Sequence, residues 1–115
     1  MLKPRSARFT ISGRVAHKLA YRPSAKADLQ DIYLWLRDEA GAETAFDYVW
    51  RLHAACRGLC NFPGRGSPRD DLAPGVRTIA FERRAVIAYL VEAGTVRIVH
   101  ILRHGRDIGQ AFNDD

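Results

Sequence analysis

The chain has 115 residues, of which 47% are hydrophobic and 27% are charged. This length and composition predict one globular domain that buries a core of its own. No apolar run reaches the roughly 18 residues of a membrane span, and no N-terminal stretch has the apolar centre of a secretory signal. We therefore expect a cytoplasmic protein that does not enter a membrane.

The net charge of +5 is unevenly distributed along the chain. Residues 1–22 carry six basic side chains and no acidic one, and residues 64–107 carry eight basic and five acidic ones. Fifteen of the eighteen cations are arginine, whose planar fork suits carboxylates, phosphates and base edges. The clustering favours an acidic partner, either a nucleic acid or an acidic peptide. A genome rich in arginine codons is the alternative explanation for any single arginine.

The first 17 residues show no clear periodicity and are predicted to be a flexible N-terminal extension, followed by a single domain over residues 18–115. The extension is basic, so it is either an arm that touches nucleic acid or, as we favour, a disordered tail. Only residues 9–11 resemble a strand within it. A short strand is expected at residues 18–22, where Leu19 and Tyr21 alternate with Lys18, Ala20 and Arg22.

Two helices are predicted next. The first begins at Ser24, a suitable N-cap, and stops at Gly41, which tolerates the left-handed conformation that ends many helices. The second runs from near Glu43 to Asn61. Apolar residues recur at helical spacing in both, namely Ala25, Leu29, Ile32, Tyr33 and Leu36 in the first, and Ala45, Val49, Leu52, Cys56 and Leu59 in the second. The tight turn at Gly41 predicts an antiparallel helix hairpin.

Each predicted helix carries one tryptophan, Trp35 in the first and Trp50 in the second. Tryptophans at such positions belong to the core or to the interface between the helices more often than they anchor a partner. We therefore expect both to be packed inside the hairpin.

After a Gly/Pro-rich loop over residues 63–75, three strands are expected. They cover residues 76–81, 85–92 and 95–103, separated by short turns, and the almost wholly apolar 85–92 is typical of a central strand. Strict alternation in 95–103 would place Arg97, Val99, Ile101 and Arg103 together on one face. The tail after Ile108 is expected to fray. The predicted order is β-α-α-β-β-β, an α+β fold with the helix hairpin on one face of a small, mainly antiparallel sheet.

His53, Cys56 and Cys60 fall on roughly one helix face, and such ligands could bind zinc. We favour the simpler interpretation, in which the two cysteines are small core residues, because no fourth ligand or paired CxxC is visible in the sequence. The cysteines are too far apart on a helix for a disulfide. No metal and no cofactor is predicted.

Arg65, Arg69, Asp70 and Asp71 lie in the Gly/Pro-rich loop. Two interpretations are equally open. The loop could shape a partner surface, or the two aspartates could pair with nearby arginines.

The order of these elements and several stretches of sequence resemble the RelE/ParE family of toxins from type II toxin–antitoxin modules, which includes plasmid stabilisation proteins. The resemblance runs over residues 18–108 and rests on YRPSAKADLQDIYLWL, FPGRGSPRDDLAPGVR, AYLVE and RIVHILRHGRDI. The ParE branch fits better than the RelE branch. The chain departs from ParE-like sequences where Arg103 precedes His104, because a histidine often follows the Ile-Leu pair directly.

The resemblance implies a growth-inhibiting toxin that a cognate antitoxin holds inactive in a hetero-oligomer. ParE-like toxins act on DNA gyrase and trap its cleaved DNA, whereas RelE-like toxins cut mRNA in the ribosomal A site. The antitoxin, of ParD type here, is usually a small DNA-binding dimer whose C-terminal segment wraps the toxin, and the pair commonly represses its own promoter. Nucleic acid would therefore be contacted only through the antitoxin or the target.

Ribonuclease chemistry needs a base, an acid and cations for the phosphate oxygens. In this chain the candidates are His104, Arg103, Arg84 and Arg77, and only the histidine has a pKa suited to proton transfer. No lysine follows Lys26, and no tyrosine lies near the C-terminus. We therefore favour a non-enzymatic gyrase inhibitor over a RelE-like endoribonuclease. A non-toxic relative that still binds antitoxin is a third hypothesis.

The partner-binding residues that we predict are arginines: Arg77, Arg83, Arg84, Arg97, Arg103 and Arg106. An amphipathic antitoxin helix is expected to lie across the toxin, with an extended segment at a strand edge or along the arginines. Acidic antitoxin side chains would then meet Arg77, Arg84 or Arg103.

Overall fold

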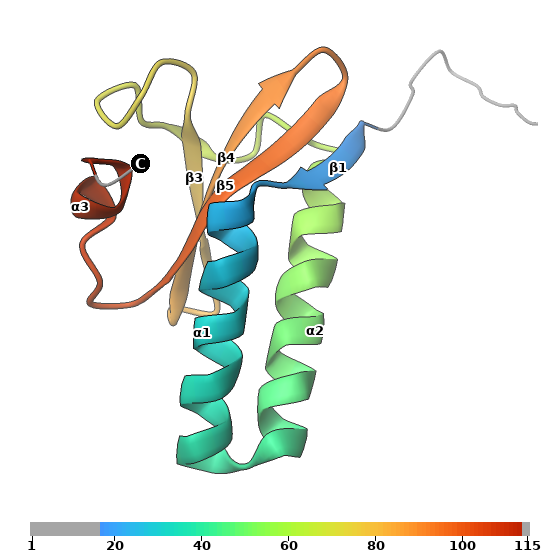
Figure 1. The fold of residues 1–115 in the computed structure, drawn as a ribbon. Helices are drawn as coiled ribbons and strands as arrows, with labels where there is room; N and C mark the ends of the chain where they lie inside the picture. The colour runs from blue at the N-terminus through green and yellow to red at the C-terminus, as the bar shows by residue number, and fades with distance from the viewer. Residues whose placement is uncertain (1–16, 114–115) are drawn as a thin grey trace, which may run out of the picture.

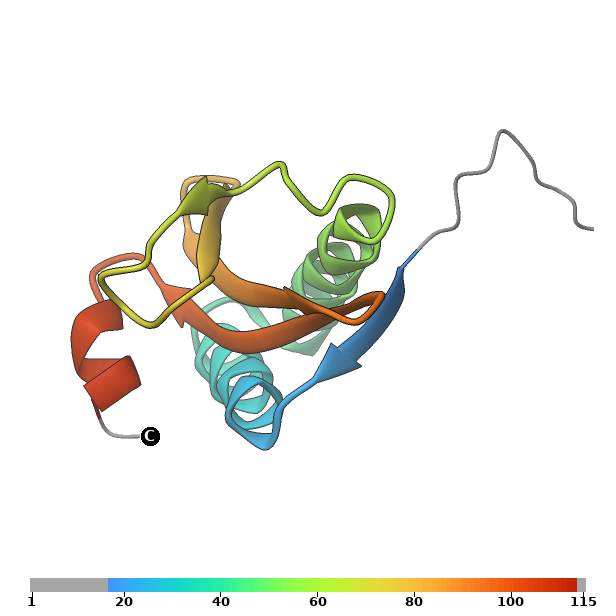
Figure 2. The same ribbon diagram turned by 90° about the horizontal axis from the view of Figure 1, so that it is seen from above.

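The computed structural model describes residues 17–113, which form a small sheet with a helix hairpin on one face (Figures 1 and 2). Within this part of the chain the elements are β1 (Lys18–Tyr21), α1 (Pro23–Ala40), α2 (Ala42–Leu59), β2 (Ser67–Pro68), β3 (Arg77–Phe81), β4 (Ala85–Glu92), β5 (Thr95–Arg103) and α3 (Ile108–Asn113). The predicted α+β fold and its β-α-α-β-β-β order are confirmed, with β2 and α3 as additions. The extension before residue 17, including the strand-like residues 9–11, lies outside the described residues.

The sheet has the strand order β1-β5-β4-β3-β2. Strand β1 runs parallel to β5, and the remaining pairs are antiparallel. The central strands β4 and β5 are the most buried, as their apolar sequences predict. β1 lies at one end of the molecule and α3 at the other (Figures 1 and 2).

The helix hairpin packs its two apolar stripes against β4 and β5, where the core is built. Leu52, Cys56, Ile87, Ile98 and Tyr89 are fully buried in this core. The predicted stripes are confirmed in outline, and Tyr48, which also faces the core, was overlooked in the second one. None of the helices in residues 17–113 is long and apolar enough to cross a membrane.

The start of α1 differs from the prediction. The helix begins at Pro23 with Arg22 as its N-cap residue, and Ser24 makes no cap. The Ser24 hydroxyl instead donates to the backbone carbonyl of Val99 at 2.7 Å. Strand β1 pairs with β5 only as far as Ile98, so the edge of β5 beyond that point is open to side chains from α1. This hydrogen bond to β5 replaces the N-cap hydrogen bond that the serine hydroxyl was predicted to make to its own helix.

The prediction that both tryptophans are packed was wrong. Trp50 is 63% exposed and Trp35 is 41% exposed. Trp50 lies two residues before Leu52, and therefore on nearly the opposite side of α2 from that core residue. Helical periodicity alone would have placed Trp50 on the surface.

The predicted alternation along β5 was also wrong, because the strand contains a β-bulge. Ala88 pairs with His100 and Tyr89 pairs with Ile98, so the register skips Val99. One extra residue reverses which face the following side chains occupy. Ile101 therefore joins Ile98 in the core beneath the helices, whereas His100 packs edge to face on Phe112 of α3, with ring centroids 5.2 Å apart.

The residues after Ile108 form the short helix α3 where fraying was predicted. The Asp107 side chain accepts a hydrogen bond from the Gln110 backbone N–H at 3.1 Å, which is the geometry of an N-cap. Together with the contact between Phe112 and His100, this cap explains why six residues can hold a helix that would not persist alone.

Candidate partner-binding site

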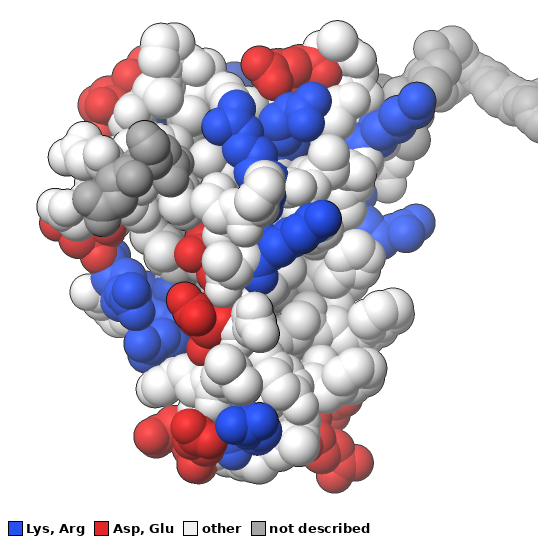
Figure 3. Space-filling view, viewed as in Figure 1, with Lys and Arg blue, Asp and Glu red and all other residues white. Residues whose placement is uncertain are grey.

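Basic side chains lie over several parts of the face seen in Figure 3, and Arg83, Arg84 and Arg103 come together at the end of the sheet where β5 leaves it. At this end an open cleft of about 280 Å³ lies between the helix hairpin, the β3–β4 turn and the last residues of β5. We call it the arginine cleft, and its lining residues are Ile32, Trp35, Leu36, Tyr48, Arg83, Arg84, Arg103 and His104. It combines an apolar and aromatic wall with three guanidinium groups and one imidazole.

The β3–β4 turn, which carries Arg83 and Arg84, has an unusual backbone conformation. Glu82 and Arg83 both have positive φ, +49° and +58°, a region that L residues other than glycine rarely adopt. The turn is closed by a hydrogen bond from the Arg84 N–H to the Phe81 carbonyl at 2.9 Å. Backbone strain of this kind persists only where surrounding contacts maintain it.

A bidentate ion pair supplies that support. Arg51 of α2 donates from Nε and Nη2 to the two Glu82 carboxylate oxygens, at 2.9 and 3.0 Å. The hydrogen bond from Arg51 holds the pKa of Glu82 below its usual value. The Arg84 carbonyl also accepts from the His104 N–H at 2.6 Å. These contacts join the turn to α2 and to the end of β5, so the arginine side chains project from a fixed frame.

Arg103 reaches the arginine cleft because of the bulge in β5. Its guanidinium carbon lies 4.2 Å from the centre of the Trp35 ring on α1, which is close for a cation–π contact. Trp35 was not predicted to be a site residue. Its position three residues after the core residue Ile32 places it at the margin of the apolar stripe, and that position was the available signal.

The other three predicted arginines lie elsewhere. Arg77 donates to the carbonyls of Gly64 and Gly66 and so braces the Gly/Pro-rich loop. Arg97 pairs with Glu92 at 3.2 Å, near the β4–β5 turn. Arg106 lines a shallow depression beside the carboxylates of α1. The structure therefore brings Arg83, Arg84, Arg103 and His104 together and separates Arg77, Arg97 and Arg106 from them.

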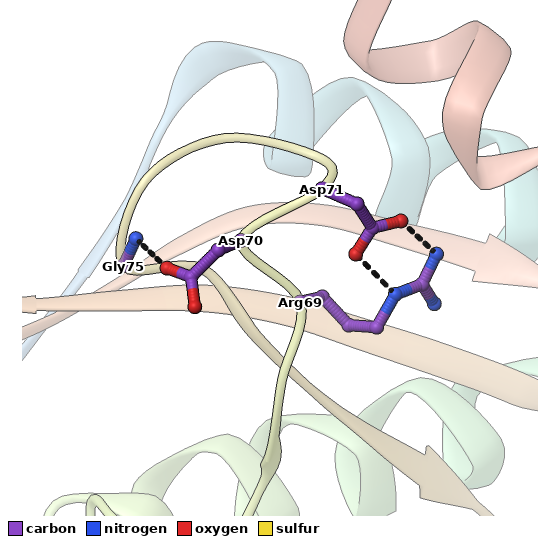
Figure 4. A network of polar contacts seen from close by, with 4 residues as sticks. All are labelled: Arg69, Asp70, Asp71 and Gly75. Atoms are coloured by element: carbon purple, nitrogen blue, oxygen red, sulfur yellow. Dashed lines mark hydrogen bonds and ion pairs between the residues drawn. The ribbon is translucent and has the colours of Figure 1, made fainter.

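The Gly/Pro-rich loop is organised by its own polar contacts (Figure 4). The Arg69 guanidinium donates two hydrogen bonds to the Asp71 carboxylate, of 2.9 and 3.0 Å. The Asp70 carboxylate accepts a hydrogen bond from the Gly75 N–H at 2.8 Å. The proposed pairing with arginine thus holds for Asp71, while Asp70 stabilises a backbone turn. The equal alternative, a role in shaping a partner surface, stays a prediction.

The cysteines and His53 contact Tyr21 and the core. His53 Nδ1 lies 2.8 Å from the Tyr21 hydroxyl, and Cys56 and Cys60 are buried free thiols. Burial raises the pKa of Cys56 to about 11, which makes the thiolate scarce at neutral pH. Residues 17–113 contain no group of three His, Cys, Asp or Glu side chains arranged to hold a metal ion.

The fold agrees with that of toxins from toxin–antitoxin systems. A solved structure described as the chromosomal ParDE toxin–antitoxin system from P. aeruginosa superposes with a TM-score of 0.68 and 28% sequence identity, covering 76% of this chain and 96% of that one. The sheet with its helix hairpin is thus the architecture of a toxin of this class.

Sequence comparison gives the family. Residues 19–108 match the model of the ParE toxin of the type II toxin–antitoxin system parDE. Toxin ParE1 from Caulobacter vibrioides is 34% identical over 77 residues, which are 66% of this chain and 80% of that protein. The chain belongs to the ParE toxin family of type II toxin–antitoxin systems.

Proposed function

We propose that this chain inhibits DNA gyrase and that a cognate ParD-type antitoxin neutralises it by binding the arginine cleft. Gyrase as the target follows from the resemblance to ParE-like toxins. The observation that supports the cleft is the convergence of Arg83, Arg84 and Arg103 beside an apolar and aromatic wall. A peptide that alternates carboxylates with apolar side chains would match both components.

The proposed complex is a cytoplasmic hetero-oligomer that contacts DNA only through the antitoxin or gyrase. Within it, the arginines of the cleft make the charge-assisted contacts to the antitoxin, and Arg77, Arg97 and Arg106 contribute from outside the cleft.

A supercoiling reaction tests the target. Relaxed plasmid, purified gyrase and ATP are incubated with and without the full chain. Loss of supercoiled product together with protein-linked, cleaved plasmid is expected. Undiminished supercoiling, with no cleaved plasmid, would contradict gyrase inhibition. Heat-denatured chain is the control for non-specific binding of a basic protein to DNA.

A ribosome-dependent endoribonuclease is the second candidate, and one observation favours it. His104 lines the same cleft as three arginines, so a proton-transfer group lies beside groups able to neutralise a phosphate. His104→Ala would abolish mRNA cleavage on ribosomes and growth inhibition if this candidate held. Under the gyrase proposal, the same variant inhibits growth as the natural chain does.

A further inference from the structure

The outer face of α2, away from the arginine cleft, carries two large exposed aromatic side chains. Phe46 is 62% exposed and Trp50 is 63% exposed. Four residues apart on one helix, they lie on the same side, one turn from each other. Figure 3 shows an uncharged area over α2, with acidic side chains gathered at the tip of the hairpin. Exposed aromatic groups of this kind usually mark a surface that binds another protein.

Charges of opposite sign flank this aromatic pair along α2. Glu43 lies in the first turn of the helix and Arg57 in its last turn, and both are exposed. Fourteen residues of helix separate them by roughly 21 Å, at 1.5 Å per residue, so the two side chains cannot pair within one chain. A partner that paired with both charges would need a basic and an acidic group about as far apart, in the opposite order along its own surface.

A second copy of the same helix, running antiparallel, provides that surface. With a twofold axis at Trp50, each position faces the one equally far on the other side of Trp50. Glu43 then faces Arg57 of the other copy, and Phe46 faces Ala54. Asp47 likewise faces His53. Glu43 and Arg57 are complementary in charge, and Phe46 and Ala54 are complementary in size, as an isologous interface requires.

We propose that the outer face of α2 is a self-association surface on which two copies of this chain pair through antiparallel α2 helices, with Trp50 on the twofold axis. This inference goes beyond the proposed function and does not depend on it.

The shape of the surface fits such a pairing. A depression of about 290 Å³ is lined by Trp50, His53, Ala54 and Arg57, and it is the place that Phe46 of the other copy occupies. The small side chain of Ala54 leaves room for that phenylalanine ring. The His53 ring is held by the Tyr21 hydroxyl at 2.8 Å and lies 5.8 Å from the Trp50 ring, centroid to centroid. The Trp50 ring thus packs on an imidazole that is itself held in place before association.

The test is the mass of the full chain in solution as a function of concentration. The chain, of 12.9 kDa, is made by cell-free synthesis and followed by sedimentation equilibrium. A monomer in equilibrium with a species of twice that mass is expected. Trp50→Glu would place two carboxylates on the axis and weaken association at least tenfold, while circular dichroism remains that of the natural chain because Trp50 is on the surface.

Charge exchange makes the test specific. Glu43→Arg alone and Arg57→Glu alone each place like charges opposite each other and should weaken the dimer several-fold. The double variant Glu43→Arg, Arg57→Glu restores opposite charges and should recover the dimer. Glu39→Arg, at the exposed end of α1, is the matched control and should leave association unchanged.

Three results would overturn the proposal: a chain that stays monomeric at every concentration, a dimer insensitive to Trp50→Glu, or a double variant as weak as the single ones. A monomeric chain whose affinity for antitoxin drops with Trp50→Glu would assign the face to the antitoxin instead. Supercoiling inhibition is measured separately, so a failure of the gyrase proposal is distinguishable from a failure of this one.

Discussion

Asp28 Oδ2 lies 2.9 Å from His100 Nδ1, and the same oxygen accepts the Ile101 backbone N–H, also at 2.9 Å. One carboxylate oxygen on α1 thus serves a side chain and a backbone donor of β5, beyond the point where β1 stops pairing with that strand. Buried donors need such partners. Asp28 therefore accepts a backbone hydrogen bond from β5 that a neighbouring strand would otherwise accept. In this way the first turns of α1 attach the helix hairpin to the sheet.

This contact predicts the effect of Asp28→Ala. Leaving the buried Ile101 N–H without its acceptor should lower the free energy of unfolding by about 1–3 kcal/mol. Urea denaturation measures this free energy, from the midpoint of the unfolding transition and the dependence of the unfolding free energy on urea concentration. Asp31→Ala is the matched control, because Asp31 is exposed on the same helix and its loss should change stability by less than about 0.5 kcal/mol. Equal losses in the two variants would contradict a structural role for Asp28.

Gly66→Ala should destabilise the Gly/Pro-rich loop. A Cβ atom at Gly66 would lie 2.7 Å from the Tyr89 hydroxyl and 2.9 Å from the Thr78 carbonyl, and that hydroxyl bonds both the Gly66 N–H and the Pro63 carbonyl at 2.8 Å. We expect a loss of about 1–3 kcal/mol, as for other overpacked sites, measured by thermal denaturation. Gly64→Ala is the control, since nothing lies within 4 Å of its added Cβ. If Gly66→Ala were as stable as Gly64→Ala, the loop would have moved to accept the added methyl group without cost, and the prediction would be wrong.

Stability should fall in alkaline solution because of Cys56. Burial raises the pKa of this thiol to about 11, so the folded chain keeps the proton to higher pH than the unfolded chain does. Its contribution is complete below about pH 8.5, the pKa of a free thiol, and is lost as pH rises toward 11. The expected slope approaches about 1.4 kcal/mol per pH unit for one proton.

Urea denaturation at pH 7.5, 9, 10 and 11 measures this slope. In Cys56→Ala the loss of unfolding free energy per pH unit should be smaller, because the thiol no longer titrates. A part of the slope should remain, because burial also raises the pKa of Tyr21. Ile87→Val is the control, because it removes a methyl group from the same core without removing a titrating group. If Cys56→Ala and the natural chain lose the same stability between pH 7.5 and 11, the Cys56 thiol does not cause the alkaline loss of stability.

Charge reversal in the arginine cleft should weaken antitoxin binding. Arg84→Glu and Arg103→Glu would each replace an attractive contact by a repulsive one, and a drop in affinity of tenfold or more, about 1.4 kcal/mol, is expected by calorimetry. Raising the salt concentration should reduce the affinity of the natural chain more than that of the variants. Arg37→Glu, at the hairpin tip, is the charge-matched control. Unchanged affinity in both cleft variants would rule out this docking.

Much of the fold was predictable because its elements have clear local patterns. The apolar run of β4 and the alternation before the bulge in β5 identify two central strands, and the stripes that contain Ile32 and Leu52 identify the helices. The site was less predictable. Arg83 and Arg84 follow each other in the sequence, but their proximity to Arg103 depends on how β4 and β5 pair.

The sequence alone determined the helix hairpin, the three main strands and the excess of arginine, because each depends on the spacing or composition of neighbouring residues. Only the tertiary structure decided that Val99 is skipped, which turns Arg103 toward Trp35. It also decided that Ser24 and Asp28 bond to β5 instead of to their own helix, and that residues 108–113 form a helix against His100. These features depend on donors, acceptors and surfaces supplied by residues far away in the chain, which local periodicity does not record.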